Sequence, residues 1–235
     1  MNNLISTRLS IVLIAIVLFG CSKENDENDT SKYHPFLVTN KIWAEGAFII
    51  QNNKEVLVLG QFDKIGSDTI ANGVKWKKYY ISYDENHKNF QLYGLLREDS
   101  SKIYYRWPVG DAKSPDGYPR IVYDFSLKTG DEIQLQPWQP AEWLPYHVYK
   151  VDSVKYLPTF NHEKRKHIFL SPKNQFYQSG YVVWIEGIGS NYGLMSNESI
   201  EGRIGAATLL LCCKENGAYI YQNTKYNVCY LGSND

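Results

Sequence analysis

The sequence predicts an all-β domain made of antiparallel strands, and three observations lead to this prediction. Aromatic residues make up 14% of the 235-residue chain, and with valine and isoleucine they recur in short runs that favour extended backbone. Clusters of glycine, asparagine, aspartate and proline separate these runs at short intervals, as they do in hairpins. No window of helical length repeats its apolar residues with a period of 3.6.

Ten segments have the composition of strands, and four polar clusters between them have the composition of turns. The strand segments are residues 47–51, 55–59, 74–83, 90–97, 102–107, 120–125, 148–156, 165–170, 181–186 and 207–213. The turn clusters are residues 52–53, 98–101, 128–131 and 215–217. Asn216 and Gly217 form the strongest turn signal, because both tolerate left-handed backbone and suit a hairpin that leads into a strand at 219–221. Short connections pair neighbouring strands, so we expect a meander.

The pattern within the strands predicts which faces are covered. Ile103, Tyr105 and Trp107 fall on one face of segment 102–107, so we expect that face to lie on the core and the other to meet water. Segment 209–213 reads Leu-Leu-Leu-Cys-Cys without alternation, which indicates a central strand covered on both faces. A sheet of this many strands curls into an open barrel or splits into a two-layer sandwich, and the sequence leaves both open.

Residues 1–20 have the organisation of a secretory signal peptide. Arg8 is their one charge, nine apolar residues follow at 11–19, and Gly20 precedes Cys21. As a helix, nine residues would extend roughly 13 Å, too short for a hydrocarbon core of about 30 Å. The Leu-Phe-Gly-Cys run that ends at Cys21 resembles the lipobox of bacterial lipoproteins, which implies cleavage before Cys21 and lipid on its thiol and amino terminus.

The chain after the signal divides into a tether and one domain. Residues 21–34 are acidic and polar, so we expect a flexible tether there, followed by a single all-β domain over 35–235. The start of the tether is similar to the export signal of Bacteroidetes surface lipoproteins, and it also has the composition of a generic linker. Removing Arg8 with the signal leaves 24 basic and 25 acidic side chains, a formal charge of −1, which disfavours nucleic-acid binding.

Three further cysteines predict one disulfide in an oxidising compartment. Cys212 and Cys213 are adjacent, and either can pair with Cys229 to close a loop that would stabilise the domain by roughly 3 kcal/mol. The remaining thiol is expected in the core. No fourth ligand accompanies these cysteines, and His162 and His167 do not have metalloprotease spacing, so we expect no metal site.

Two segments are candidates for function or for special structure. The proline-rich stretch 137–146 interrupts the strands, and its aromatic residues could form a ligand platform or could simply fill the core: Trp138, Trp143 and Tyr146. The segment after strand 181–186 has neither the spacing of a phosphate-binding loop nor that of a nucleophile elbow. We expect it to be a buried structural loop, formed by Trp184, Glu186, Gly187, Gly189 and Ser190.

Several blocks together resemble a Bacteroidetes family of small secreted or lipid-anchored β-rich proteins without an assigned activity. The blocks include Tyr-Asp-Phe-Ser-Leu-x-x-Gly-Asp at 123–131, Trp-Ile-Glu-Gly-Ile-Gly-Ser at 184–190, and Leu-Cys at 211–212 with a later cysteine. The resemblance implies that Cys212, rather than Cys213, pairs with Cys229. It implies no particular reaction.

The sequence therefore favours an outer-membrane lipoprotein, on the periplasmic or the outer side, with a non-catalytic binding or structural role. We expect attachment to the membrane through lipid on Cys21, a glycan or an envelope protein as partner, and no catalytic residue, cofactor or metal. One alternative is a carboxylate-dependent hydrolase of glycans that uses Glu186 with Asp124 or Asp131. The other is an accessory subunit of an outer-membrane assembly.

Overall fold

The computed structural model describes residues 32–52, 54–84, 88–107, 118–135, 147–173, 181–196, 207–226 and 229. Within them the chain forms strands and turns and no helix, which confirms the all-β prediction. In these described parts there is accordingly no helix of the length and apolar character needed to cross a membrane. The strands are β1 (Lys41–Gln51), β2 (Lys54–Ala71), β3 (Val74–Ser82), β4 (Gln91–Asp99), β5 (Lys102–Arg106), β6 (Arg120–Asp124), β7 (Glu132–Leu135), β8 (His147–Pro158), β9 (Lys164–Pro172), β10 (Val182–Ile185), β11 (Gly189–Ser190), β12 (Ala207–Glu215) and β13 (Ala218–Gln222).

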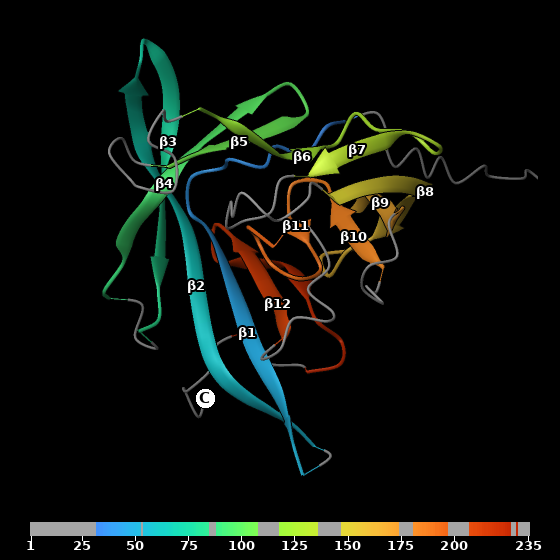
Figure 1. Cartoon of the computed structure of the whole chain (residues 1–235). Helices are drawn as coiled ribbons and strands as arrows, with labels where there is room; N and C mark the ends of the chain where they lie inside the picture. The colour runs from blue at the N-terminus through green and yellow to red at the C-terminus, as the bar shows by residue number, and fades with distance from the viewer. Residues whose placement is uncertain are drawn as a thin grey trace, which may run out of the picture.

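The strands form two antiparallel sheets. The larger has the order β13-β12-β1-β2-β3-β4-β5-β6, and the smaller has the order β11-β10-β9-β8-β7. Neighbours in sequence pair from β1 to β6 and from β7 to β11, as expected for a meander. The exception is β12, which returns to the larger sheet and pairs with β1, from Lys41 opposite Glu215 to Phe48 opposite Ala207. Figure 1 shows β12 beside β1 and the smaller sheet next to them.

Four strands differ clearly from the sequence prediction. Strand β1 begins at Lys41 rather than at residue 47, β2 extends to Ala71 rather than to 59, and neither β7 nor the short β11 was predicted. Glycine and charged residues in these stretches have low strand propensity, and Asp63 in the middle of β2 is an example. Pairing of β2 with β1 on one side and β3 on the other holds these residues in the sheet despite their propensity.

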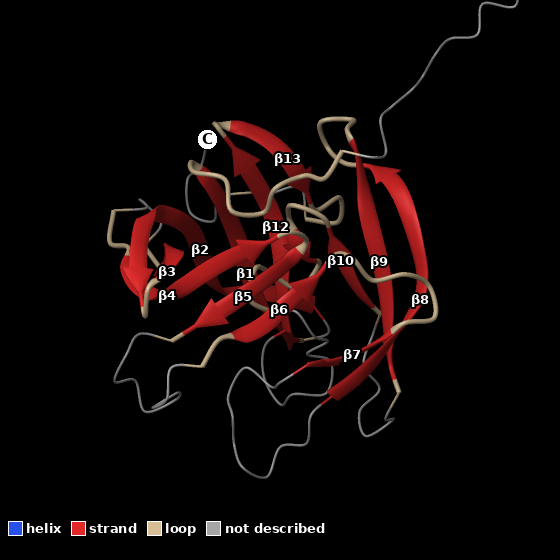
Figure 2. Cartoon of the chain, turned by 90° about the horizontal axis from the view of Figure 1, so that it is seen from above, coloured by secondary structure: helices blue, strands red, loops and turns tan. Residues whose placement is uncertain are grey.

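One core lies between the two sheets, each of which curls as half of a barrel (Figure 2). Trp43 and Tyr79 come from the larger sheet, and Trp184 and Tyr149 from the smaller; all four are buried. The ring of Tyr123 in β6 meets that of Trp184 in β10 edge-on, with centroids 5.2 Å apart. The arrangement therefore combines the two expected forms, two facing layers that are both strongly curled.

The covered faces agree with the prediction, but the face of β5 that was expected to meet water does not, since Arg106 is buried there and Lys102 and Tyr104 are half-buried. Ile103, Tyr105 and Trp107 are all buried in this core, as their alternation indicated. In β12, Cys213 points into the same core, whereas Cys212 packs on the opposite face of the sheet. Strand β12 is therefore covered on both faces, as its unbroken apolar run predicted.

Candidate functional site

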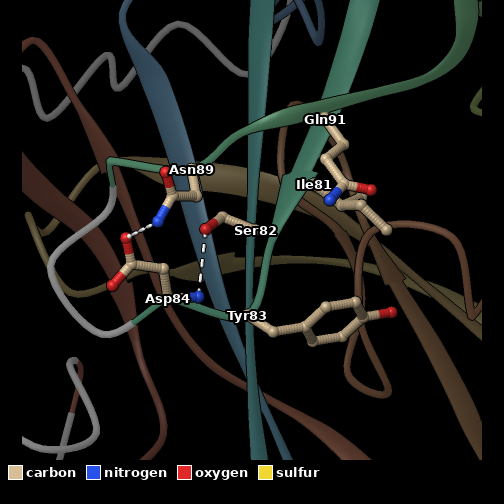
Figure 3. Close-up of a pocket in the computed structure, with 6 residues that line it drawn as sticks. All are labelled: Ile81, Ser82, Tyr83, Asp84, Asn89 and Gln91. Carbon is tan, nitrogen blue, oxygen red and sulfur yellow. Dashed lines mark hydrogen bonds between the residues drawn. The ribbon is translucent and has the colours of Figure 1, made fainter.

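A small pocket lies where β3 ends and β4 begins, and Figure 3 shows its lining. Its volume is about 280 Å³, and it is lined by Ile81, Ser82, Tyr83, Asp84, Asn89 and Gln91. The two strand ends are tied together, because Ile81 and Gln91 are partners in the β3–β4 ladder. The paired sheet therefore fixes the base of the pocket.

One wall of the pocket is polar and held in place by hydrogen bonds. The Oδ2 atom of Asp84 accepts hydrogen bonds from Asn89 Nδ2 at 2.9 Å and from the backbone N–H of Lys88 at 3.2 Å. The backbone N–H of Asp84 donates to Ser82 Oγ at 3.0 Å. These bonds orient a carboxylate and an amide side by side before any ligand arrives.

The opposite wall is aromatic and open to solvent. Tyr83 is 55% exposed, and Figure 3 shows its ring on the side of the pocket away from the Asp84–Asn89 pair, with Ile81 and Gln91 above the ring on that side. Ile81 is only 6% exposed and contributes apolar surface. Among the described residues, neither the Tyr83 hydroxyl nor the side-chain amide of Gln91 makes a hydrogen bond, so both remain available to a ligand.

A pair of carboxyl groups is buried in the core under the same sheet. Glu45 of β1 and Asp63 of β2 lie on adjacent strands, where Trp43 is the register partner of Asp63. The hydroxyl of Tyr79 donates to Asp63 Oδ1 at 2.5 Å, and the backbone N–H of Leu194 donates to Glu45 Oε1. Among the described residues, Asp63 Oδ2 receives no N–H or hydroxyl donor. The Glu45 carboxyl interacts with that of Asp63, and each of the two groups influences the pKa of the other.

The pKa values of the pair agree with a shared proton. Burial raises the pKa of Asp63 to about 6, against the opposing hydrogen bonds from Tyr79, Gln61 and Glu45. Burial and the charge of Asp63 raise the pKa of Glu45 well above its usual value. At neutral pH Glu45 therefore holds the proton and Asp63 the negative charge.

The charge of this acid pair reaches the pocket. Partial burial is the main cause that raises the pKa of Tyr83, and the groups that add to it are Tyr93, Asp63 and Glu45. The pocket therefore has the carboxylate of Asp84 at its wall, and Asp63 lies near enough to Tyr83 to raise the pKa of its hydroxyl. The acid pair itself is fully buried, so a ligand in the pocket would feel its charge without touching it.

The glycine-containing loop after β10 closes the core at one end. All five residues expected there are buried: Trp184, Glu186, Gly187, Gly189 and Ser190. Trp43 Nε1 donates to the carbonyl of Ile188 at 2.7 Å, and Lys41 Nζ donates to that of Gly187 at 3.0 Å. Gly187 has a φ of +73°, and a Cβ there would lie 2.6 Å from Arg165 Nη1. The close packing requires glycine at this position.

Residues 33–37, which we call the N-terminal strap, cross the ends of both sheets. Glu98 of β4 accepts hydrogen bonds from the Tyr33 hydroxyl at 2.7 Å, from Phe36 N–H at 2.8 Å and from Leu37 N–H at 2.9 Å. Glu186, at the end of β10, accepts one from His34 N–H at 3.0 Å. Tyr33 and His34, assigned to the tether from sequence, thus bond to the domain.

The carboxylates considered for a hydrolase each have a structural partner. Glu186 binds the strap, and Asp124 accepts from the backbone and hydroxyl of Ser126 at 3.0 and 2.5 Å. Asp131 accepts from Lys128 N–H at 2.8 Å within a turn. None of the three carboxylates lines the described pocket. Their geometry favours structural roles.

The disulfide joins Cys212 to Cys229, which confirms the predicted pair, and Cys213 is a buried free thiol. Cys229 and Cys212 pack with Ala44 and Phe62 in a small second core on the outer face of the larger sheet. The bridge therefore ties the end of the chain to the central strands.

Replacing Cys229 with serine is expected to lower the free energy of unfolding by about 2 to 3 kcal/mol, because the bridge closes a segment with a sequence separation of 17. Urea unfolding without reductant measures the loss. In a reducing buffer the wild type and the variant should unfold at nearly the same urea concentration. A difference of the same size in both buffers would show that the bridge is not its cause.

Four of the residues singled out from sequence lie outside the described residues, namely Cys21, Trp138, Trp143 and Tyr146. Lipidation and the aromatic platform therefore stay predictions. Among the described residues, no three side chains of histidine, cysteine, aspartate or glutamate are grouped as metal ligands would be.

Comparisons with protein-family models, with curated proteins and with solved structures find no match to this chain. Membership of the Bacteroidetes family stays a prediction.

Sequence reasoning missed both the pocket and the buried acid pair. Glu45 and Asp63 lie in stretches that were not predicted as strands, so no inward face was assigned to them. The one signal in the sequence is that Asp63 and Ile65 alternate along β2, which places an acid and an apolar residue on one face. Tyr83 and Gln91 stand at ends of predicted strands, but nothing in the sequence indicates that these ends form a pocket.

Proposed function

We propose that this protein is a lipid-anchored protein of the bacterial cell envelope that acts by binding rather than by catalysis. The observation that carries the proposal is the N-terminal strap. It is bonded to the domain at the point where the expected tether from Cys21 would join it. Glu98 belongs to β4 of the larger sheet, and Glu186 directly follows β10 of the smaller sheet, so the strap is bonded next to both. A chain held this firmly at its N-terminal entry is suited to attachment from that end.

The tether sets how far the domain works from the membrane. Residues 22–32 separate Cys21 from the strap, and eleven extended residues span at most about 40 Å. Tyr33 and His34 are bonded to the domain and so add nothing to this length. The domain therefore remains near the lipid surface, where it would meet ligands attached to or passing through the envelope.

The described polar groups favour binding over reaction. Glu45 and Asp63 form the one proton-sharing pair among the described carboxyl groups, and both are sealed in the core. The pocket instead offers an exposed ring and an available amide, Tyr83 and Gln91, beside a single carboxylate, Asp84. This set can hold a ligand, and the described lining offers no second acid across the pocket of the kind that glycoside hydrolysis uses.

Replacing Cys21 with serine tests the anchor. The wild-type protein is expected in the membrane fraction, with a blocked, lipid-bearing amino terminus by mass spectrometry, because several acyl chains hold it there. The Cys21→Ser protein is expected in the soluble fraction. Cys213→Ser serves as the matched control, since it removes another thiol and should leave the protein in the membrane. An unmodified amino terminus on the native protein would overturn the proposal.

A further inference from the structure

The pocket at the junction of β3 and β4 has the size for one ring rather than for an extended chain. Its volume of about 280 Å³ is slightly below the roughly 300 Å³ at which sites for drug-sized ligands begin. It is open to solvent on the side of Tyr83, so a ring at the end of a longer molecule could enter while the remainder stays outside.

The pocket also combines the two kinds of contact that a sugar requires. The exposed face of Tyr83 offers a flat π surface, and the C–H groups of a pyranose carry the partial positive charge that such a surface attracts. Asp84 and Asn89 provide acceptors and donors on the opposite side of the pocket, and Gln91 provides them above the ring of Tyr83. Neighbouring hydroxyls of a sugar match a carboxylate and an amide that are already held side by side.

The charge of the described lining disfavours acidic ligands. The described lining contains one carboxylate and no lysine or arginine, and the buried acid pair adds to the negative potential at Tyr83. A phosphate or a uronic acid would therefore be repelled. A cation would be attracted by Asp84, but two donors already compensate part of that charge, and the remaining polar groups are neutral.

We propose that this pocket binds a single neutral sugar ring, stacked on Tyr83 and hydrogen-bonded by Asp84, Asn89 and Gln91. This inference deepens the proposed binding function and depends on it, since it names the ligand class of an anchored binding protein. The sugar would be the terminal residue of a glycan, because the pocket has room for one ring.

Saturation-transfer NMR on the purified mature protein tests the assignment. The protein is kept in a zwitterionic detergent without a sugar headgroup, and the probes are the methyl glycosides of glucose, galactose, mannose and N-acetylglucosamine. At least one is expected to receive saturation, with the strongest transfer to its ring protons. Methyl glucuronide should receive at least fivefold less than methyl glucoside if glucose is the sugar bound.

Substitutions locate the binding. Tyr83→Ala is expected to reduce the transfer at least fivefold, whereas Tyr83→Phe keeps the ring and most of the signal. Gln91→Ala should reduce it because the hydrogen-bonding edge is lost. Tyr156→Ala is the matched control, since Tyr156 is 44% exposed on β8 of the other sheet and should leave the signal unchanged.

Three outcomes would overturn the assignment. The first is no saturation transfer to any of the four methyl glycosides, and the second is a signal that Tyr83→Ala does not reduce. The third is transfer only to ethanolamine, added as a cationic probe, which would make this a cation site. The anchor is judged separately by fractionation. If the protein is membrane-bound but binds no sugar, only the sugar-binding inference is contradicted. If it is soluble but binds sugar, only the lipid anchor is contradicted.

Discussion

Replacing Gly193 with alanine is expected to lower the free energy of unfolding by about 4 kcal/mol, the sum of a strained backbone and an overpacked core. Gly193 has a φ of +137°, where residues with a side chain are strained. A Cβ there would also overlap the carboxyl group of Glu45, which is fully buried. Glu45 cannot move aside without losing its bonds to Leu194 and Asp63.

Gly130→Ala separates the two causes. Gly130 has a φ of +93° in a turn, and a Cβ there meets no atom within 4 Å, so only backbone strain of roughly 1 to 2 kcal/mol is expected. Urea unfolding followed by tryptophan fluorescence reports both variants, because Trp43 and Trp184 are buried in the folded state. Equal losses at the two positions would contradict the close packing of Gly193 against Glu45.

The stability contributed by the buried acid pair is expected to fall as the pH rises. The folded protein binds the Asp63 proton more tightly than the unfolded chain does, because burial raises the pKa of Asp63 from 3.8 to about 6. The stabilisation is therefore complete below pH 4 and is lost as the pH rises toward 6. A shift of about two units corresponds to about 3 kcal/mol. Glu45, whose pKa is also raised, extends the decline to higher pH.

Asp63→Asn tests this pH dependence. The quantity measured is the difference in the free energy of unfolding between the variant and the wild type at pH values from 4 to 8. The variant should gain stability relative to the wild type as the pH rises, since asparagine carries no charge to bury. Taking the difference removes the opposite contribution of surface acids such as Asp68, whose pKa is lowered by Lys75 and Lys77. Parallel curves for the two proteins would contradict the prediction.

Local patterns in the sequence predicted the parts of the fold that depend on neighbouring residues. The alternation of Ile103, Tyr105 and Trp107 identified the covered face of β5 and the residue after it. The run that ends in Cys212 and Cys213 identified a strand covered on both sides. These predictions succeeded because side-chain direction in a strand follows directly from position.

Features that depend on register between distant segments were not predictable in this way. The pairing of β12 with β1 joins residues more than 150 positions apart, and no local signal specifies it. The acid pair exists because β1 and β2 place Glu45 and Asp63 on the same inner face, which requires the register of two strands whose bounds were underestimated. The pocket likewise arises where two strand ends and their connection come together in space.

The strap has a mechanical consequence. Any pull that reaches Tyr33 along the chain is divided between Glu98 on one sheet and Glu186 beside the other. Lys41 adds a third support, since its ammonium group donates to the carbonyl of Pro35 at 2.9 Å. Force applied at this end would thus be distributed over both sheets. It would not act on one edge strand alone and pull that strand away from its sheet.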